Sequence, residues 1–337
     1  LNEKKVRVFG PNKFASQLEG SKAFMKNLCK KNNIPTANFG VFNNLDDASS
    51  FIKKNGTPIV VKADGLAAGK GVVVANTLQE ALTALNDCLV KKKFGASGET
   101  VLIEEYLSGE ELSVFAFVDD THVSSLVAAC DYKRIWDGDS GPNTGGMGAF
   151  TPPHFWDKEL EKIVANDIMV PVAKTMSDMG NPYRGILYAG IMLTQSGPMV
   201  YEFNCRFGDP EAQVILPRLK SDMAVVMMAV AQRKLDGTQV QWSDDAAVCV
   251  VIASQGYPES YNTGFEIMGL DDTGHSLVFH SGTRKNADGK YITDGGRVLS
   301  VVSIDSSVSE ARLKTYENLN TIKFEGSFHR NDIALTK

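Results

Sequence analysis

Two short runs of β-branched residues, at positions 59–61 and 72–74, stand out in the hydrophobic pattern of the first third of the chain. Such runs predict strands, and here they flank a glycine-containing loop. Stretches with helical spacing lie on either side, at 46–54 and 78–89, and a further strand is expected at 38–42. The pattern therefore predicts a small lobe of β-α-β-β-α order.

The middle of the chain carries a long amphipathic stretch. Apolar residues recur at helical spacing from Leu160 to Met176, which predicts a core helix that Pro171 kinks. Two strands are expected next, at 186–193 and 199–203, on either side of a turn that contains Gly197.

A polar stretch at 236–245 marks a boundary between domains. Beyond it we expect an α+β lobe with a final helix that begins at a Ser307 capping box. Its expected strands lie at 248–253, 276–280 and 297–304.

Composition narrows the class of protein. The chain has 337 residues, enough for two domains, and a net charge of −5, which argues against a nucleic-acid surface. No apolar run approaches the roughly 18 residues of a membrane span. The five cysteines are scattered, without any C-x-x-C pair, as is typical of reduced thiols in a cytoplasmic protein.

The loop between the first two strands has the composition of a phosphate-binding loop. Glycines lack a Cβ and let backbone N–H groups approach phosphate oxygens, and lysines add positive charge. The spacing differs from the Walker motif, and a strand follows in place of a helix. An ordinary hairpin with a flexible turn is the alternative. The residues concerned are Lys62, Gly65, Gly69, Lys70 and Gly71.

Upstream, Gly20 interrupts a helical pattern and predicts a break, with Ser21 as the N-cap of a second helix. Lys22 is then either a solvated helix lysine or a charge directed at a nucleotide. Downstream, the strand at 101–107 runs into Glu104 and Glu105. One interpretation is that the backbone N–H and C=O groups of this strand bind an adenine edge. The simpler interpretation is an exposed acidic turn.

Two further stretches carry polar residues with a recognisable pattern. Strand alternation puts Glu202, Asn204 and Arg206 on one face, where the first two offer the oxygen ligands that Mg²⁺ prefers. The same alternation points Cys205 inward, so we do not expect it to act as a nucleophile. The segment from Asp131 to Gly148 lacks hydrophobic periodicity, and a loop of that length is more often functional than idle.

Six phrases in order give the chain a family resemblance. They are QLEGSKAF, KADGLAAGKGV, DYKR, GPNTGGMGA, EFNCRFGDPE and GGRVL. With them the sequence resembles the glycinamide ribonucleotide synthetases, or phosphoribosylamine–glycine ligases, of the ATP-grasp superfamily. The resemblance implies a carbon–nitrogen ligase of purine biosynthesis that uses ATP and Mg²⁺ or Mn²⁺. Glycine would be activated as an acyl phosphate, which 5-phosphoribosylamine then attacks.

The resemblance also implies residue roles. The ATP phosphates would be bound by Lys22, Lys62 and the loop residues Gly65, Gly69, Lys70 and Gly71. The adenine would be bound by Glu104, Tyr106 and Leu107, and the ribose by Glu111. Glu202 and Asn204 would hold the metal. Lys62, Arg206 and Asp209 would assist catalysis. Substrate contacts would come from Asp131, Lys133, Arg134, Asn143, Thr144, Gly145, Gly146, Met147, Arg206, Asp209 and Arg297.

The implied fold mixes α+β and α/β parts. An ATP-grasp domain is expected at 21–237, with a lid subdomain at about 36–103, and a C-terminal α+β domain at 238–337. Residues 1–20 would end an N-terminal α/β domain that family members carry and this sequence lacks, so we expect a fragment. The enzyme is expected to be cytoplasmic, a monomer or weak oligomer, without nucleic-acid or membrane partners. Alternatives are another ATP-grasp ligase or carboxylase, or a non-catalytic ATP-binding module.

Overall fold

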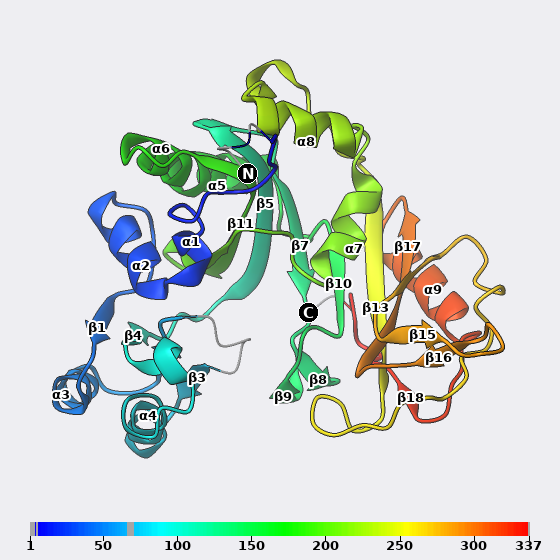
Figure 1. Ribbon diagram of the computed structural model, residues 1–337, viewed down its shortest axis with the longest axis horizontal. Helices are drawn as coiled ribbons and strands as arrows, with labels where there is room; N and C mark the ends of the chain where they lie inside the picture. Colours follow the sequence, from blue (N-terminus) through cyan, green and yellow to red (C-terminus); the bar gives the residue numbers. More distant parts are fainter. Residues whose placement is uncertain (1–3, 5, 66–70, 336–337) are drawn as a thin grey trace. The chain divides into compact units, whose positions relative to one another are not determined.

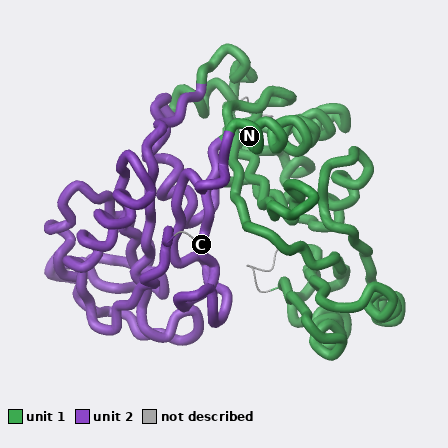
Figure 2. The backbone as a smooth tube through the Cα atoms, turned by 180° about the vertical axis from the view of Figure 1, so that it is seen from behind, with its two compact units in different colours: residues 1–126, 158–206, 224–239 green, residues 127–157, 207–223, 240–337 purple. Residues whose placement is uncertain are grey.

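The computed structural model describes residue 4, residues 6–65 and residues 71–335, which group into two compact units (Figure 2). Unit 1 comprises residues 1–126, 158–206 and 224–239. Unit 2 comprises residues 127–157, 207–223 and 240–337. Two stretches inside the range expected for the ATP-grasp domain, 127–157 and 207–223, thus group with the C-terminal part of the chain.

The first sheet of unit 1 has four antiparallel strands in the order β1-β4-β2-β3 (Figure 1). Its elements are β1 (Phe39–Phe42), α3 (Leu45–Asn55), β2 (Ile59–Ala63), β3 (Val72–Ala75), α4 (Leu78–Leu85) and β4 (Val101–Glu105). A π-helical turn (Asn86–Val90) follows α4, and a 3-10 turn (Gly95–Gly98) precedes β4. The β-α-β-β-α order predicted from the sequence is confirmed.

Alternation along these strands separates packing residues from polar ones. Ile59, Val61 and Ile103 pack with residues of α3 and α4 in one buried cluster. Because side chains alternate between the faces of a strand, Lys62 and Glu104 point to the opposite face. The sheet therefore gathers its charged side chains on the face away from the helices.

The second sheet of unit 1 runs in the order β12-β11-β5, with β6 beside β5. Its strands are β5 (Glu110–Asp120), β6 (His122–Val123), β11 (Tyr183–Thr194) and β12 (Gly197–Asn204). The expected strands at 186–193 and 199–203 are the cores of β11 and β12.

The helices of unit 1 are α1 (Gln17–Gly20), α2 (Lys22–Lys31), α5 (Lys158–Val164), α6 (Val170–Asp178) and α8 (Met223–Gln232), with a 3-10 turn at Leu235–Gly237. The predicted break at Gly20 is confirmed, because Ser21 caps α2 by accepting a hydrogen bond from the Phe24 N–H. The expected helix at 160–176 is interrupted by a π-helical turn (Ala165–Met169), and Pro171 lies in the first turn of α6. The π-helical turn runs directly into α6, so the regular hydrogen-bond ladder is already interrupted just before Pro171, which has no N–H to donate.

Unit 2 contains five sheet strands in the order β7-β10-β13-β17-β14, with β18 beside β13, and the hairpins β8–β9 and β15–β16. The strands are β7 (Val127–Asp131), β8 (Arg134–Trp136), β9 (Ser140–Asn143), β10 (Gly148–Thr151), β13 (Ala246–Ser254), β14 (Leu277–His280), β15 (Thr283–Lys285), β16 (Tyr291–Thr293), β17 (Arg297–Asp305) and β18 (Ser327–Phe328). Its helices are α7 (Glu211–Ile215), followed by a 3-10 turn (Leu216–Arg218), and α9 (Val308–Leu319).

The core of unit 2 lies between the sheet and α9. Val250 of β13 and Val301 of β17 share a buried cluster with Ala311 and Leu319 of α9. Ser307 caps this helix by accepting a hydrogen bond from the Glu310 N–H, as the sequence predicted. In the part of the chain that the structure describes, no helix is long and apolar enough to cross a bilayer.

Candidate active site

A buried trio of charged side chains lies on the polar face of the first sheet in unit 1. Glu104 of β4 accepts from Lys62 of β2 at 2.7 Å and from Lys26 of α2 at 2.7 Å, one oxygen for each lysine. The three side chains are 3%, 9% and 0% exposed, respectively. Lys62 also donates to the Tyr201 carbonyl of β12 at 3.3 Å, and Lys26 to the Thr36 hydroxyl at 2.7 Å.

The pKa values within this trio follow from burial and from the neighbouring charges. Burial acts to raise the pKa of Glu104, but the ammonium groups of Lys62 and Lys26 outweigh it, and the pKa lies below its ordinary value. Burial lowers the pKa of Lys26. Sequence reasoning missed Lys26. It lies four residues after Lys22 on the same helix, and this i, i+4 spacing was the signal that it shares the face of Lys22.

The N-terminus of α2 lies against the end of β2, where the glycine-rich loop begins. The Asp64 carboxylate accepts from the Ser21 hydroxyl at 3.1 Å and from the Ala23 N–H at 2.6 Å. Lys22 donates from Nζ to the Gly65 carbonyl at 3.1 Å. Burial lowers the pKa of Lys22, and the negative charge of Glu202 is the largest influence that opposes this shift. Lys22 is therefore close to both the loop and strand β12.

The expected phosphate loop is described only at its two ends. A Cβ on Gly65 would lie 2.5 Å from the Ser97 hydroxyl, so the position accepts only glycine without rearrangement. The Gly71 carbonyl accepts from the Ala63 N–H at 2.8 Å. Gly69 and Lys70 lie outside the described residues.

The stretch expected to bind adenine follows β4 directly. Tyr106 is 46% exposed and Leu107 is half-buried. The Glu105 carboxylate is held by the Asn38 N–H at 2.9 Å and by the Asn38 amide at 3.0 Å. Glu111 is exposed on β5, opposite Met192 of β11. Tyr106 and Leu107 are therefore accessible to a ligand, whereas the Glu104 side chain contacts Lys62 and Lys26.

Strand β12 brings the expected metal ligands together. The Asn204 amide donates to the Glu202 carboxylate at 3.2 Å, and Arg206 donates to the Asn204 oxygen at 3.3 Å. The three side chains share a face, as alternation predicted. Glu19 of α1, which sequence reasoning missed, forms an ion pair with Arg206 at 3.3 Å and accepts from the Cys205 N–H at 2.9 Å.

The oxygen atoms of Glu202 and Asn204 suit a divalent cation. Mg²⁺ in nucleotide sites is held by one or two side-chain oxygens together with phosphate oxygens, so a pair of protein ligands suffices. Within residues 4, 6–65 and 71–335, no three His, Cys, Asp or Glu side chains group as a self-sufficient metal centre. The donors thus fit a cation that a nucleotide brings with it.

In unit 2, Arg297 connects the glycine-rich segment 141–148 to Asp209. Its guanidinium forms two bonds with the Asp209 carboxylate, at 2.8 and 3.1 Å, and donates to the Gly145 carbonyl at 2.8 Å. The Gly145 N–H donates to the Tyr257 hydroxyl at 2.9 Å. Gly146 has a φ of +110°, and a Cβ there would lie 2.4 Å from Pro210, so glycine is required.

The remaining expected substrate residues surround the same segment. The Thr144 hydroxyl and N–H both donate to the Lys133 carbonyl at 2.8 Å, and Lys133 forms an ion pair with Asp131 at 3.4 Å. Arg134 lies opposite Asn143 in the β8–β9 hairpin. Met147 is the exception, because its side chain is fully buried with Ile135 and Ala253. It serves packing, and we do not assign it a substrate contact.

Comparison with known proteins identifies the family. The model of the phosphoribosylglycinamide synthetase ATP-grasp (A) domain matches residues 20–212, and that of the C domain of the same family matches residues 247–336. Phosphoribosylamine–glycine ligase of Halalkalibacterium halodurans is 50% identical over 99% of this chain and 78% of its own length.

Comparison with solved structures supports the same family assignment. Phosphoribosylamine–glycine ligase of Thermotoga maritima superposes with a TM-score of 0.86 at 35% identity, over 97% of this chain and 81% of its own. The biotin carboxylase domain of 2-oxoglutarate carboxylase from Hydrogenobacter thermophilus has a TM-score of 0.72 at 17% identity, over 97% and 71% of the two chains, and shares the fold alone. The ATP-grasp fold predicted from the sequence is confirmed, and this chain belongs to the phosphoribosylglycinamide synthetase family.

Proposed function

We propose that the chain catalyses the ATP-dependent joining of glycine to 5-phosphoribosylamine, which yields glycinamide ribonucleotide, ADP and phosphate in purine biosynthesis. Beyond family membership, one observation in unit 1 carries the proposal. The Lys62 ammonium bonds both to Glu104 and to the Tyr201 carbonyl, next to the oxygen ligands of β12. The Lys62 ammonium and the expected metal ligands of β12 are thus neighbours, and the phosphates of a nucleoside triphosphate need both a cationic group and a metal ion.

The chemistry needs positioning and charge neutralisation. An oxygen of the glycine carboxylate attacks the γ-phosphorus of ATP, the bond to the β–γ bridging oxygen breaks, and ADP leaves. The amine nitrogen of 5-phosphoribosylamine then attacks the carbonyl carbon of glycyl phosphate, loses a proton, and phosphate leaves. Neither step requires a protein nucleophile. Burial raises the pKa of Cys205 to about 11, which leaves the nearby thiol protonated.

For ATP, we assign the phosphates to Lys22, Lys62 and the loop from Gly65 to Gly71. Tyr106 and Leu107 would line the adenine through the accessible segment after β4, with Glu104 holding Lys62 in place. Glu111 would bind the ribose. A bound Mg²⁺ or Mn²⁺ would neutralise charge on the phosphate oxygens, and Glu202 with Asn204 would hold it.

For the two small substrates, we assign three arginines and the glycine-rich segment. Arg206 in unit 1 would bind a carboxylate or phosphate bidentately. In unit 2, Arg297, Asp209 and Arg134 would shape the pocket together with Asp131, Lys133, Asn143, Thr144, Gly145 and Gly146. Arg297 would approach the phosphate of the ribosyl group.

The wider setting of the enzyme is also a proposal. All five cysteines are free, in keeping with a reducing cytoplasm, and the chain would act as a monomer or weak oligomer on small molecules. The domain division at residues 20/21 and 237/238 stays a prediction.

The test is ADP release with Mg-ATP, glycine and 5-phosphoribosylamine generated in situ, with each component omitted in turn. We expect release only when all three are present. ADP release with a different acid in place of glycine would contradict the proposal and favour another ATP-grasp ligase or carboxylase. Tight Mg-ATP binding with no release under any condition would instead favour a non-catalytic nucleotide module.

A further inference from the structure

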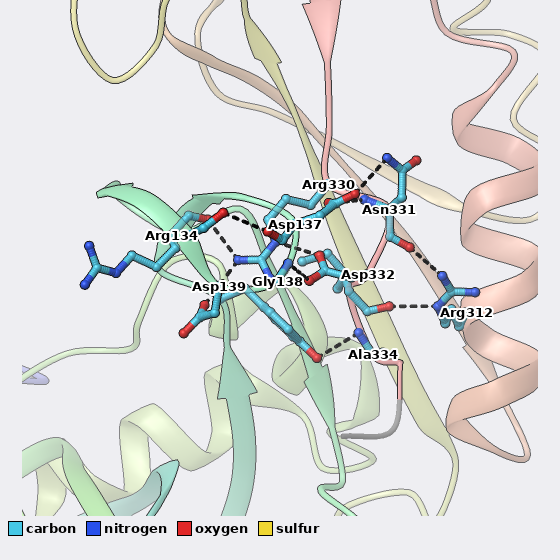
Figure 3. A network of polar contacts seen from close by, with 12 residues as sticks. Arg134, Asp137, Gly138, Asp139, Arg312, Arg330, Asn331, Asp332 and Ala334 are labelled. Carbon is cyan, nitrogen blue, oxygen red and sulfur yellow. Dashed lines mark hydrogen bonds and ion pairs between the residues drawn. The ribbon is translucent and has the colours of Figure 1, made fainter. Parts of the chain in front are cut away.

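The C-terminal segment of unit 2, residues 330–334, contacts the β8–β9 hairpin through several hydrogen bonds, at whose centre lies the buried Arg330 (Figure 3). Arg330 is 1% exposed, and its guanidinium faces two directions. On one side it forms a bidentate pair with Asp332, at 2.7 and 2.6 Å. On the other it donates to the Arg134 carbonyl at 2.9 Å and to the Asp139 carboxylate at 3.3 Å.

The contacts around Arg330 join the same two segments. The Asp332 carboxylate accepts from the Gly138 N–H at 2.9 Å, which closes a ring of hydrogen bonds with the hairpin. Asn331 donates twice to Asp137, from its N–H at 2.8 Å and from its amide at 3.1 Å. The guanidinium also lies 4.8 Å from the centre of the Tyr132 ring.

The hairpin in turn leads into the glycine-rich segment. Arg134 begins β8 and is paired with Asn143 at the end of β9. The Arg134 side chain donates to the Gly141 carbonyl at 2.7 Å, and the Thr144 N–H donates to the Lys133 carbonyl at 2.8 Å. The base of the hairpin and the start of the segment are therefore one hydrogen-bonded unit, and Arg330 binds that unit at the carbonyl of Arg134.

We infer that Arg330 is a positioning residue, which fixes the β8–β9 hairpin and through it the segment 141–146 that receives the small substrates. The inference rests on the proposed function for the part of the pocket that this segment forms. A buried guanidinium is costly to leave unpaired, so its partners on both sides are held together. An exposed hairpin is thereby fixed in place as a support for a substrate loop.

The variant that tests this is Arg330→Lys, compared with Arg312→Lys. A lysine keeps the charge for Asp332 but lacks the planar fork that reaches the hairpin at the same time. Arg312 is the matched control, because it donates to the carbonyls of Asn331 and Ile333 in the same C-terminal segment, and these two hydrogen bonds do not involve the hairpin. Two quantities are measured: amide hydrogen exchange across residues 133–145, and the KM for each substrate.

For Arg330→Lys we expect faster exchange in the hairpin and a KM for glycine and for 5-phosphoribosylamine raised roughly tenfold, since small displacements of a positioning group cost this much or more. The KM for ATP and kcat stay unchanged. Arg312→Lys leaves hairpin exchange and all three KM values unchanged. If Arg330→Lys does not fold, Asp139→Asn, which removes the exposed hairpin carboxylate that pairs with the Arg330 guanidinium, takes its place and shifts both quantities in the same direction.

Unchanged hairpin exchange in Arg330→Lys overturns the inference, and so does an equal effect from Arg312→Lys. Faster exchange with unchanged KM values for both small substrates overturns the connection to the pocket, while leaving the ligase activity in place. Absence of ligase activity in the unmodified chain is a separate result: it contradicts the proposed function, and hydrogen exchange alone then decides whether Arg330 fixes the hairpin.

Discussion

Lys62 and Glu104 form an ion pair of 2.7 Å on the polar face of the first sheet, and Glu104 shares its other oxygen with Lys26. Two lysines and one glutamate give the trio a charge of +1, in a place where side-chain exposure does not exceed 9%. Because electrostatic attraction is stronger where water is excluded, this positive charge is well suited to a phosphate group. Glu104 in turn restrains the lysine that would carry it.

Replacing Lys62 by methionine tests this arrangement. Methionine keeps much of the side-chain length but removes the ammonium group, and Glu104 still has Lys26 as a partner. A charged hydrogen bond contributes about 1.5–3 kcal/mol, so we expect the Kd for Mg-ATP to rise about ten- to a hundredfold. Titration calorimetry measures it. The control is Lys93→Met, on a lysine of unit 1 whose side chain is 58% exposed. An unchanged Kd in Lys62→Met would remove Lys62 from the nucleotide site.

The metal assignment predicts a different outcome for Glu202→Gln. Glutamine has the same shape and still accepts from the Asn204 amide, which lies 3.2 Å away, so the fold and the melting temperature stay unchanged. The lost charge weakens the cation site, and because a catalytic metal contributes several kcal/mol, turnover falls by roughly a hundredfold or more.

Two readouts check that prediction. ADP release gives the loss of turnover, and the paramagnetic resonance of Mn²⁺ added with ATP gives the loss of metal binding. Glu159→Gln, an exposed residue of α5, is the control. Full turnover in Glu202→Gln would show that the metal is held elsewhere.

Local patterns predicted much of this site. Period-2 alternation on one strand placed Glu202 and Asn204 on the same face, because that face depends only on neighbours in sequence. Lys26 and Glu19 escaped prediction because their partners are remote. The Glu19 carboxylate accepts a hydrogen bond of 2.9 Å from the N–H of Cys205, which lies 186 residues away in sequence. The i, i+4 spacing puts Lys26 on the face of Lys22, but no pattern within α1 or α2 indicates that Lys26 and Glu19 will meet these distant partners.

The glycine-rich segment shows the same limit. Its composition predicted an irregular loop, but residues 140–143 form strand β9 and Gly148 begins β10, so only the part around Gly146, which has a positive φ, is irregular. Composition did not show that Met147 is buried in the core, nor that Arg330 supports the hairpin from a position 196 residues away in sequence. Those features follow from the packing of unit 2 as a whole.

Cys205 provides a test of the chemistry. Its pKa is raised to about 11, mainly by burial, so at pH 8 only about one thiol in a thousand is ionised. We expect slow alkylation of Cys205 by iodoacetamide at this pH, and turnover within about twofold of the unmodified enzyme for Cys205→Ala, because no step uses the thiol. Mass spectrometry and ADP release measure the two effects. Rapid alkylation with loss of activity would instead indicate that Cys205 acts as a nucleophile.

Alkaline pH is expected to destabilise the folded chain through Tyr132. Burial raises the pKa of its hydroxyl to about 12, from an ordinary value of 10.0. The folded state therefore holds the proton more tightly than the unfolded state. The resulting stability is fully present below pH 10 and is lost as the pH rises toward 12. It amounts to about 3 kcal/mol. Urea unfolding at pH 9 to 11.5 measures the loss, which we expect to be smaller in Tyr132→Phe. Equal losses in both proteins would contradict this cause.

The pair formed by Arg297 and Asp209 gives the sharpest test of the substrate pocket. Arg297→Lys keeps the positive charge but cannot form two parallel bonds with Asp209 while donating to the Gly145 carbonyl. We expect the KM for 5-phosphoribosylamine to rise about tenfold, because a charged hydrogen bond is worth about 1.5–3 kcal/mol. The KM for ATP stays unchanged, since the residues that we propose for the ATP phosphates lie in unit 1.

Arg284→Lys is the control for that measurement, because Arg284 is an exposed arginine of unit 2 whose ion pair is with Asp294. Steady-state kinetics with one substrate varied at a time separates the three KM values. A rise in the KM for ATP alone would assign Arg297 to the nucleotide. A rise confined to 5-phosphoribosylamine, absent in Arg284→Lys, would identify Arg297 as a determinant of the amine substrate, because only a group that contacts or orients that substrate changes its KM selectively.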